Sequence, residues 1–174
     1  MTISPDTATA IQLLALDVDG VMTDGRIVYS SDGQESKAFH IKDGLGIKLL
    51  QKAGIEVAII TGRASEMVAR RARELGITTV LQGREDKHKA LSALADERQL
   101  DARQIAYMGD DLPDLAAIQW AGLGACPRDA CIQVLAVADY ESAYDGGQGC
   151  VREFAEALLA ARDQLSEAVA RYQL

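Results

Sequence analysis

The sequence predicts an α/β fold: a Rossmann-like, three-layer α/β/α arrangement with a mostly parallel sheet and a β-hairpin after the first strand. Two observations carry this prediction. Strand-like and helix-like segments alternate along the chain, and the strand-like segments are apolar on both faces, as strands buried in a parallel sheet are. A length of 174 residues suits a single domain, and no repeat or low-complexity linker marks a second one.

The first elements follow from an apolar run and a turn signal. Residues 1–10 are expected to be disordered, and they lack the charged and apolar regions of a signal peptide. The apolar run 11–16 predicts a strand that ends at an aspartate. Residues 23–41 then contain two β-prone pieces around Asp32-Gly33, a pair that is typical of hairpin turns.

Two strand and helix pairs follow the hairpin. Residues 43–54 predict a helix, because Asp43 is a capping residue type and a glycine closes the segment. Residues 55–60 form an apolar run that predicts a buried strand. A helix over 65–75, again closed by a glycine, and a strand over 77–82 complete this part of the chain.

The remaining elements continue the alternation as far as a long terminal helix. In order, we expect helix 87–98, strand 104–109, helix 115–121, strand 123–126, helix 130–136 and strand 138–140. A Gly-rich stretch at 145–149 is either a flexible hinge or a functional loop. Residues 151–172 have apolar positions at helical spacing and predict the last helix.

Composition excludes several classes of partner. Aromatic residues make up only 5% of the chain, so the core must be aliphatic, and the net charge of −8 argues against a nucleic-acid or anionic-membrane surface. A local basic pocket for one small anion remains compatible with this charge. No apolar run approaches the roughly 20 residues that span a bilayer. Three cysteines without CxxC spacing indicate a reducing cytoplasm.

Polar residues follow three of the expected strands directly. Asp17 and Asp19 end the first strand, Thr61 ends the second, and Asp110 ends a later one. Because the carboxyl ends of parallel strands share one edge of a sheet, we expect these side chains to meet in one crevice. The sequence therefore predicts a single site built from distant parts of the chain.

The opening motif, Asp17-Val-Asp19-Gly20, fits several readings when it is taken alone. An EF-hand would need oxygen ligands where the chain has Val21 and Val28, and no GxxxxGK[ST] phosphate loop exists. The segment "GLGIKL" lacks the last glycine of a dinucleotide-binding fingerprint. A structural turn remains open for a lone pair of aspartates.

A second acidic cluster, "GDDLPD" over 109–114, favours a metal site. It adds Asp110, Asp111 and Asp114 at another strand end, and carboxylates that converge in this way repel one another unless a cation lies between them. Oxygen ligands without clustered His or Cys suit Mg²⁺. With Arg63, Arg71 and Lys87 as cations, the set indicates phosphoryl transfer.

These motifs resemble those of the haloacid dehalogenase superfamily. "DVDGV", "TGR", Lys87 before a helix and "GDDLPD" occur in that superfamily's order. The segments "FHIKDGLGIKLL", "TGRASEMVARRARELGI" and "GGQGCVREF" further resemble the 3-deoxy-D-manno-octulosonate 8-phosphate phosphatases, which act in lipopolysaccharide biosynthesis. The resemblance covers about residues 11–160 and implies a cytoplasmic, Mg²⁺-dependent phosphoric monoester hydrolase that acts on this sugar acid phosphate.

The resemblance also implies catalytic roles. Asp17 would be the nucleophile that forms an aspartyl-phosphate, and Asp19 would protonate the leaving sugar oxygen and then activate water. Thr61 would hydrogen-bond a phosphoryl oxygen. Lys87 would neutralise the charge that accumulates in the transition state.

The implied metal ligands come from both acidic motifs. Mg²⁺ would be held by the carboxylate of Asp17, the backbone carbonyl of Asp19 and the carboxylate of Asp110. Asp111 and Asp114 would orient waters or Lys87 around the metal without binding it.

Substrate contacts are implied for a larger set that surrounds the start of the second helix. The candidates are Asp19, His40, Ile41, Lys42, Asp43, Gly44, Lys48, Arg63, Arg71 and Lys87. Solvated helix charge is an equal alternative for Lys42, Lys48 and Arg71, and a packed histidine is the commoner role for His40.

The spacing between motifs leaves no room for a cap domain. By resemblance, we expect a homotetramer in which hairpins (about 24–40) pack together and a neighbouring subunit covers the pocket. The segment "GGQGCVRE", with Arg152, would fold as a mobile tail over an adjacent site.

Other functions remain as alternatives. Within enzymes these are a phosphatase for a related nine-carbon keto-acid phosphate and a broad small-molecule phosphatase. A signalling receiver domain uses similar residues, but its phosphoacceptor lies on a middle strand, so the motif order here is wrong. A non-catalytic member is disfavoured because every motif residue is present.

Overall fold

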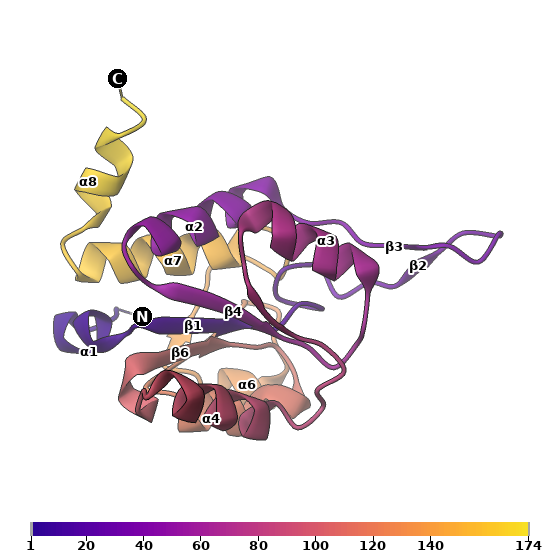
Figure 1. Ribbon diagram of the computed structural model, residues 1–174, viewed down its shortest axis with the longest axis horizontal. Coiled ribbons are helices and arrows are strands. Elements are labelled where there is room, and N and C mark those ends of the chain that lie inside the picture. Colours follow the sequence, from indigo (N-terminus) through magenta and orange to yellow (C-terminus); the bar gives the residue numbers. More distant parts are fainter. Residues whose placement is uncertain (1, 174) are drawn as a thin grey trace.

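A six-stranded parallel sheet forms the centre of the protein, whose residues 2–173 are described by a computed structural model (Figure 1). The strand order is β5-β4-β1-β6-β7-β8, with every neighbouring pair parallel. The strands are β1 (Leu13–Leu16), β4 (Glu56–Ile60), β5 (Thr79–Leu81), β6 (Ile105–Met108), β7 (Leu123–Cys126) and β8 (Tyr140–Glu141). This confirms the predicted α/β fold.

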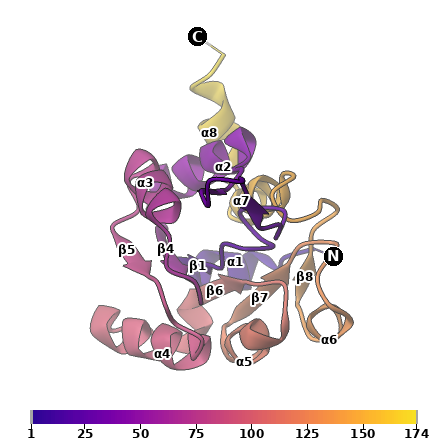
Figure 2. The ribbon, with the colours of Figure 1, turned by 90° about the vertical axis from the view of Figure 1, so that its right-hand side faces the viewer.

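Helices cover both faces of the sheet. In Figure 2, α2, α3 and α7 lie on one face, and α4, α5 and α6 lie on the other. Their bounds are α2 (Ile41–Lys52), α3 (Glu66–Leu75), α4 (Lys87–Arg98), α5 (Leu115–Trp120), α6 (Ile132–Leu135) and α7 (Cys150–Ala161). Short 3-10 turns, η1 (Ala102–Gln104) and η2 (Leu112–Asp114), precede β6 and α5. None of the helices within residues 2–173 has the length and apolar character needed to cross a bilayer.

Two aliphatic clusters bury the faces of the sheet. Successive residues of β1 point to opposite sides, so Leu14 and Leu16 belong to the cluster under α2 and α7, whereas Leu13 and Ala15 belong to the cluster over α4 and α5. Each of these four side chains is fully buried. The alternation explains why the strand reads as continuously apolar: both faces are covered.

A two-stranded hairpin follows β1 and projects from the body of the molecule (Figure 1). It consists of β2 (Val28–Tyr29) and β3 (Glu35–Ser36), with Val28 opposite Ser36 and Tyr29 opposite Glu35. The turn is closed by Ser30, which donates from its N–H to the carbonyl of Gln34 at 2.9 Å. The predicted hairpin is present, and within the described residues no cap domain stands beside it.

The ends of the chain differ from the expectation. Residues 1–10 were expected to be disordered, but α1 (Pro5–Ala10) forms there, capped by Ser4 and held by Arg162, whose Nη1 donates to the carbonyls of Ala8 and Ile11. The expected helix 151–172 is two helices, α7 and α8 (Leu165–Ala170), because Asp163 adopts a left-handed φ of 56° between them. Neither feature was visible in hydrophobic spacing alone.

The second helix also begins earlier than expected. α2 starts at Ile41 with His40 as the N-cap, so Asp43 lies inside the first turn and does not cap this helix. Its carboxylate instead accepts hydrogen bonds from the backbone N–H groups of Gly149 (3.3 Å) and Arg152 (2.8 Å) at the start of α7. Asp43 is therefore a cap for a helix more than a hundred positions further along the chain.

Candidate active site

A cleft of about 770 Å³ opens at the carboxyl edge of the sheet. Asp17, Thr61 and Asp110 line it, each directly or almost directly after its strand. The strand ladder continues into the site: Asp17 donates from its N–H to the carbonyl of Met108 at 3.0 Å, and Thr61 donates to Leu81 at 3.0 Å. Regular sheet hydrogen bonds therefore hold the backbone of these residues in place.

Three carboxylates converge at the floor of the cleft. Asp17, Asp110 and Asp114 offer oxygen atoms that lie within 4.8 Å of one another. Burial, and then the Asp114 charge, raises the pKa of Asp17 to about 6; burial, and then the Asp17 charge, raises the pKa of Asp110 to about 8. In addition, Asp17 Oδ1 is buried without a hydrogen-bond partner among the described residues. These features fit a divalent cation, which would ligate the orphaned oxygen and keep both carboxyls ionised.

Asp114 supports this cluster through hydrogen bonds that occupy both of its oxygens. Oδ1 accepts from Lys87 Nζ at 2.7 Å and from the hydroxyl of Tyr107 at 2.6 Å, while Oδ2 accepts from the N–H groups of Asp110 and Asp111, both at 3.2 Å. Burial, and then the charge of Asp114, raises the pKa of Tyr107 well above its ordinary value. The Tyr107 hydroxyl therefore keeps its proton and stays a donor. The carboxylate of Asp114 thus orients Lys87 and the loop that carries Asp110.

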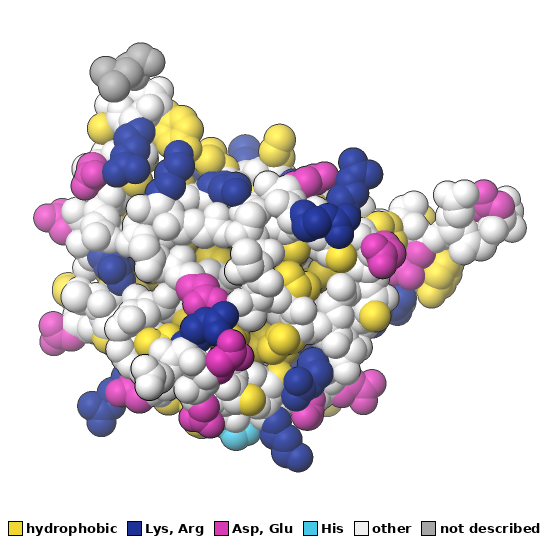
Figure 3. Space-filling model, in the orientation of Figure 1, with side chains coloured by type: hydrophobic (Ala, Val, Ile, Leu, Met, Phe, Trp, Pro, Cys, Tyr) yellow, Lys and Arg dark blue, Asp and Glu magenta, His cyan; other side chains and the backbone are white. Residues whose placement is uncertain are grey.

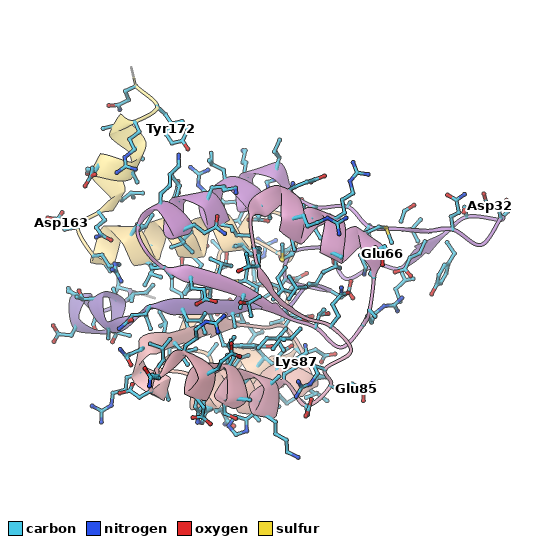
Figure 4. All side chains as sticks on the ribbon, viewed as in Figure 1. Asp32, Glu66, Glu85, Lys87, Asp163 and Tyr172 are labelled. Carbon is cyan, nitrogen blue, oxygen red and sulfur yellow. The ribbon has the colours of Figure 1, made fainter. Side chains whose placement is uncertain are left out.

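Lys87 is a buried cation at the floor of the site. Its Nζ lies 2.8 Å from Asp17 Oδ2 and 2.7 Å from Asp114 Oδ1, and its side chain is 5% exposed. Burial on its own would lower the pKa of Lys87, but the charges of Asp17 and Asp114 outweigh it and raise the pKa. Figure 4 shows Lys87 at the start of α4, below the edge of the sheet. Lys89, two residues on, is exposed.

Gly20 lets the loop after Asp19 approach Asp110. Its φ is +90°, and a Cβ atom at this position would lie 2.0 Å from Asp110 Oδ2. A side chain would therefore both strain the backbone and displace a carboxylate of the cluster. The glycine of the opening motif is a steric requirement of the site.

Asp19 lies at the mouth of the cleft and contacts the hairpin. The ammonium of Lys37, directly after β3, hydrogen-bonds Asp19 Oδ1 and lies 3.7 Å from Glu35 Oε1. Arg63 Nη2 donates to both oxygens of Glu35 at 3.1 Å, and Arg63 Nε lies 3.9 Å from Asp19 Oδ2. A hydrogen bond with Tyr29 and the charge of Glu35 raise the pKa of Arg63. Sequence reasoning missed Lys37 and Glu35, because no local motif marks them.

The expected substrate residues divide into three groups. Asp19, Arg63 and Lys87 line the cleft. A separate groove between α2 and α3, which shares no lining residue with the cleft, holds the second group, which consists of Ile41, Lys42, Gly44, Lys48 and Arg71. His40 and Asp43 form the third group, which faces α7: His40 Nδ1 lies 3.8 Å from Asp43 Oδ2, and the Asp43 carboxylate is turned to backbone N–H groups. Asp43 is therefore a structural cap and not a residue that faces the cleft.

The Gly-rich segment packs against the loop that follows Asp19 in the same chain. Gly147 donates from its N–H to the carbonyl of Val21 at 2.8 Å, and a Cβ at Gly146 would lie 1.9 Å from the carbonyl oxygen of Gly20. Arg152 lies in α7 and pairs with Glu156 at 2.6 Å. Within one chain this segment therefore packs against the loop of its own site. The expected coverage of an adjacent subunit's site stays a prediction.

Comparisons of the sequence and of the structure with known proteins find related hydrolases. Residues 41–122 match the family described as haloacid dehalogenase-like hydrolase. The chain is 43% identical to the 3-deoxy-D-manno-octulosonate 8-phosphate phosphatase KdsC of Escherichia coli (strain K12), over 92% of this chain and 86% of that protein.

Two solved structures illustrate the structural similarity. The crystal structure of 3-deoxy-D-manno-octulosonate 8-phosphate phosphatase from Moraxella catarrhalis, in complex with a magnesium ion, a phosphate ion and a KDO molecule, has a TM-score of 0.94 and 46% identity, with 97% of each chain covered. The cobalt-bound deoxy-D-mannose-octulosonate 8-phosphate phosphatase from Haemophilus influenzae has a TM-score of 0.88 and 38% identity, covering 92% of this chain and 94% of that one.

Proposed function

Because this chain belongs to the 3-deoxy-D-manno-octulosonate 8-phosphate phosphatase family of haloacid dehalogenase-like hydrolases, we propose that it releases phosphate from this sugar acid phosphate through an aspartyl-phosphate at Asp17. The observation that carries the proposal is the state of the Asp17 carboxylate. One oxygen is paired with Lys87, and the other is buried without a hydrogen-bond partner among residues 2–173, at the floor of an open cleft.

The reaction proceeds in two displacements. A carboxylate oxygen of Asp17 attacks phosphorus while the bond to the sugar oxygen breaks, and Asp19 gives its proton to that oxygen. Water then attacks phosphorus with Asp19 accepting its proton, so that phosphate leaves and the Asp17 carboxylate is restored. Thr61, at the next strand tip, donates a hydrogen bond to a phosphoryl oxygen, and Lys87 offsets the negative charge.

Mg²⁺ is the cofactor that suits these residues. The carboxylates of Asp17 and Asp110 and the backbone carbonyl of Asp19 would hold it, while Asp114 accepts hydrogen bonds from Lys87 and Tyr107. When bound, the ion neutralises charge on the phosphoryl oxygens. Asp111, which caps the 3-10 turn through Leu112 at 2.8 Å, keeps the Asp110 loop in place.

Arg63 is the cation at the cleft that suits the carboxylate of a sugar acid, because it lines the cleft. Arg71, Lys42 and Lys48 line a separate groove between α2 and α3. Figure 3 shows basic side chains gathered over α3, near the base of the hairpin. In a chain with a net charge of −8, this local excess of positive charge favours an anionic ligand at that edge.

The hairpin supports a proposed homotetramer. Its side chains Ile27, Val28 and Tyr29 are 45%, 54% and 64% exposed, an apolar surface on an element that projects from the body (Figures 1 and 3). Packing of hairpins from several subunits would bury it and cover the open cleft. The three free cysteines agree with a cytoplasmic enzyme.

The test is phosphate release from 3-deoxy-D-manno-octulosonate 8-phosphate with and without Mg²⁺. We expect turnover that is abolished by a chelator and restored by added Mg²⁺. A parallel panel of other keto-acid and simple sugar phosphates measures selectivity. Equal kcat/KM across the panel would replace the proposal with a broad phosphatase, and preference for a nine-carbon keto-acid phosphate would change the substrate.

A further inference from the structure

Lys37 has an unusual environment for a residue on a projecting hairpin. It follows β3, whose own side chains are exposed or half-buried, yet its side chain is 1% exposed. A buried ammonium is costly unless it is paired and hydrogen-bonded. Its partners are the carboxylate of Asp19, which it contacts directly, and that of Glu35, whose Oε1 lies 3.7 Å away.

Arg63 closes this arrangement from the other side. It holds Glu35 through two hydrogen bonds of 3.1 Å and reaches toward the second oxygen of Asp19, at 3.9 Å from Nε. The Arg63 side chain is 42% exposed, so solvent screens its contribution. Lys37 is therefore the one buried cation in this group, and it makes the direct contact with Asp19.

We propose that Lys37 is a positioning residue for Asp19, and that through Glu35 it couples the hairpin to the proton-transfer group of the site. This inference rests on the proposed function, because it assigns Lys37 to the residue that serves the leaving oxygen. An aspartate that is 23% exposed has several rotamers within reach. A charge-assisted hydrogen bond to one oxygen selects a single rotamer and leaves the other oxygen facing the cleft.

The energetic effect follows from geometry. A general acid acts only when its oxygen lies within hydrogen-bond reach of the leaving group, and a displacement of about 1 Å costs on the order of 100-fold in rate. Without Lys37, the remaining cation near Asp19 is Arg63, on the opposite oxygen. The carboxylate would turn toward it and away from its productive position.

The experiment compares phosphate monoesters whose leaving groups have graded pKa values, from p-nitrophenyl phosphate to simple alkyl phosphates. The p-nitrophenolate leaving group, whose conjugate acid has a low pKa, departs without being protonated, whereas an alkoxide must be protonated as it leaves. For Lys37→Met we expect kcat/KM, which reports the first displacement and not the later hydrolysis that Asp19 also serves, to fall about 10- to 100-fold on alkyl phosphates and less than about twofold on p-nitrophenyl phosphate. Lys37→Arg, which keeps the charge, should recover part of the loss. Lys89→Met, an exposed lysine on α4, is the matched control.

A double-variant cycle separates positioning from a structural effect. In an Asp19→Asn background, Lys37→Met should cause no further loss, since the group that it positions is already gone. A fall in kcat/KM of equal size on every ester, or additive losses in the cycle, would mean that Lys37 only supports the hairpin or contacts the phosphate group. Either result overturns the proposal.

Glu35→Gln keeps the proposal testable if Lys37→Met does not fold. This variant retains the Lys37–Asp19 contact and weakens the connection to the hairpin, so a smaller but equally leaving-group-dependent loss is expected. Failure of the substrate assignment is distinguishable, because wild-type protein would then hydrolyse the graded esters and leave 3-deoxy-D-manno-octulosonate 8-phosphate intact.

Discussion

At the residue scale, the two oxygens of Asp17 have different environments. Oδ2 is 2.8 Å from Lys87 Nζ, and Oδ1 is buried and unpartnered within the described structure. An unpartnered buried oxygen is costly in a purely structural residue, which evolution would tend to pair or replace. The asymmetry is what a carboxylate requires when it must both bind a cation and attack phosphorus.

Replacing Asp17 by asparagine should abolish turnover and leave the fold intact. Asparagine preserves shape but is not a nucleophile, so we expect kcat to fall by more than about 1000-fold. Steady-state phosphate release measures this, with circular dichroism as the folding check. Asp96→Asn, on the exposed side of α4, is the control and should behave as wild type. Wild-type turnover in Asp17→Asn would refute the nucleophile.

The raised pKa values predict how Mg²⁺ and pH act together on stability. The folded metal-free protein has carboxyl pKa values of about 6 at Asp17 and about 8 at Asp110, above the unfolded value of 3.8. Between about pH 4 and pH 8 the folded state therefore binds more protons than the unfolded state, and the unfolding free energy decreases as pH rises. Mg²⁺ competes with those protons and should stabilise more at high pH.

We expect the rise in Tm on adding Mg²⁺ to be larger at pH 8 than at pH 6. Differential scanning calorimetry at both values, with and without a chelator, measures it. Asp110→Asn removes the group with the higher pKa and should flatten the pH dependence of the metal-free protein. An equal Mg²⁺ effect at both pH values would contradict the linkage.

At the scale of elements, the loop after β1 and the loop after β6 fit together only because Gly20 has no side chain. Gly20 and Gly33 both have positive φ, +90° and +82°, but a Cβ at Gly20 would meet Asp110 Oδ2 at 2.0 Å, whereas a Cβ at Gly33 would meet nothing within 4 Å. The two glycines therefore share the backbone strain and differ in the steric clash.

This pair gives a matched test. Alanine at either position should reduce the unfolding free energy by about 1 kcal/mol through the unfavourable φ. Only Gly20→Ala should weaken Mg²⁺ binding, because only its Cβ would displace the Asp110 carboxylate. We expect the affinity to fall at least about 10-fold, which corresponds to about 1.4 kcal/mol of binding free energy. Isothermal titration calorimetry measures the binding. Unchanged affinity in Gly20→Ala would show that the Asp110 loop moves without cost.

The link between α2 and α7 depends on Asp43. Asp43→Ala removes the acceptor for two backbone N–H groups and should cost about 1–2 kcal/mol. Asp43→Asn keeps one acceptor oxygen but turns its NH2 group toward the other N–H, so we expect a similar cost. Urea denaturation measures both. A large rise in KM for Asp43→Asn at unchanged stability would restore a substrate role.

Elements that depend on short patterns were predictable from the sequence, and contacts between distant elements were not. Parallel strands bring their carboxyl ends to one edge, so Asp17, Thr61 and Asp110 were expected together and do lie in one cleft. Lys87 was expected at a helix start, and α4 begins there. The Lys37–Asp19 contact depends on how the hairpin bends back, and the Asp43 cap depends on packing of α2 against α7. Neither contact produces a periodic pattern in the sequence.

At the scale of the whole molecule, both the cleft and the hairpin are left uncovered in a single subunit. The cleft is open to solvent, which weakens electrostatic stabilisation of a phosphoryl group. The hairpin beside it exposes apolar side chains that a single subunit leaves uncovered (Figure 1). Lys37 and Arg63 join the two regions. Assembly through the hairpins would therefore act on the site as well as on stability.

Val28→Glu tests this assembly. In a closed symmetric assembly every subunit carries the new charge, so the free-energy cost of burying it is incurred at each copy of the interface. We expect sedimentation velocity to show a tetramer for the wild type and smaller species for the variant, together with a higher KM for the sugar acid phosphate. Ile132→Glu is the control, because Ile132 is 75% exposed on α6, on the face of the sheet opposite α2 and α3. A wild type that sediments as a monomer, or a Val28→Glu protein that assembles as the wild type does, would remove the hairpin from the interface.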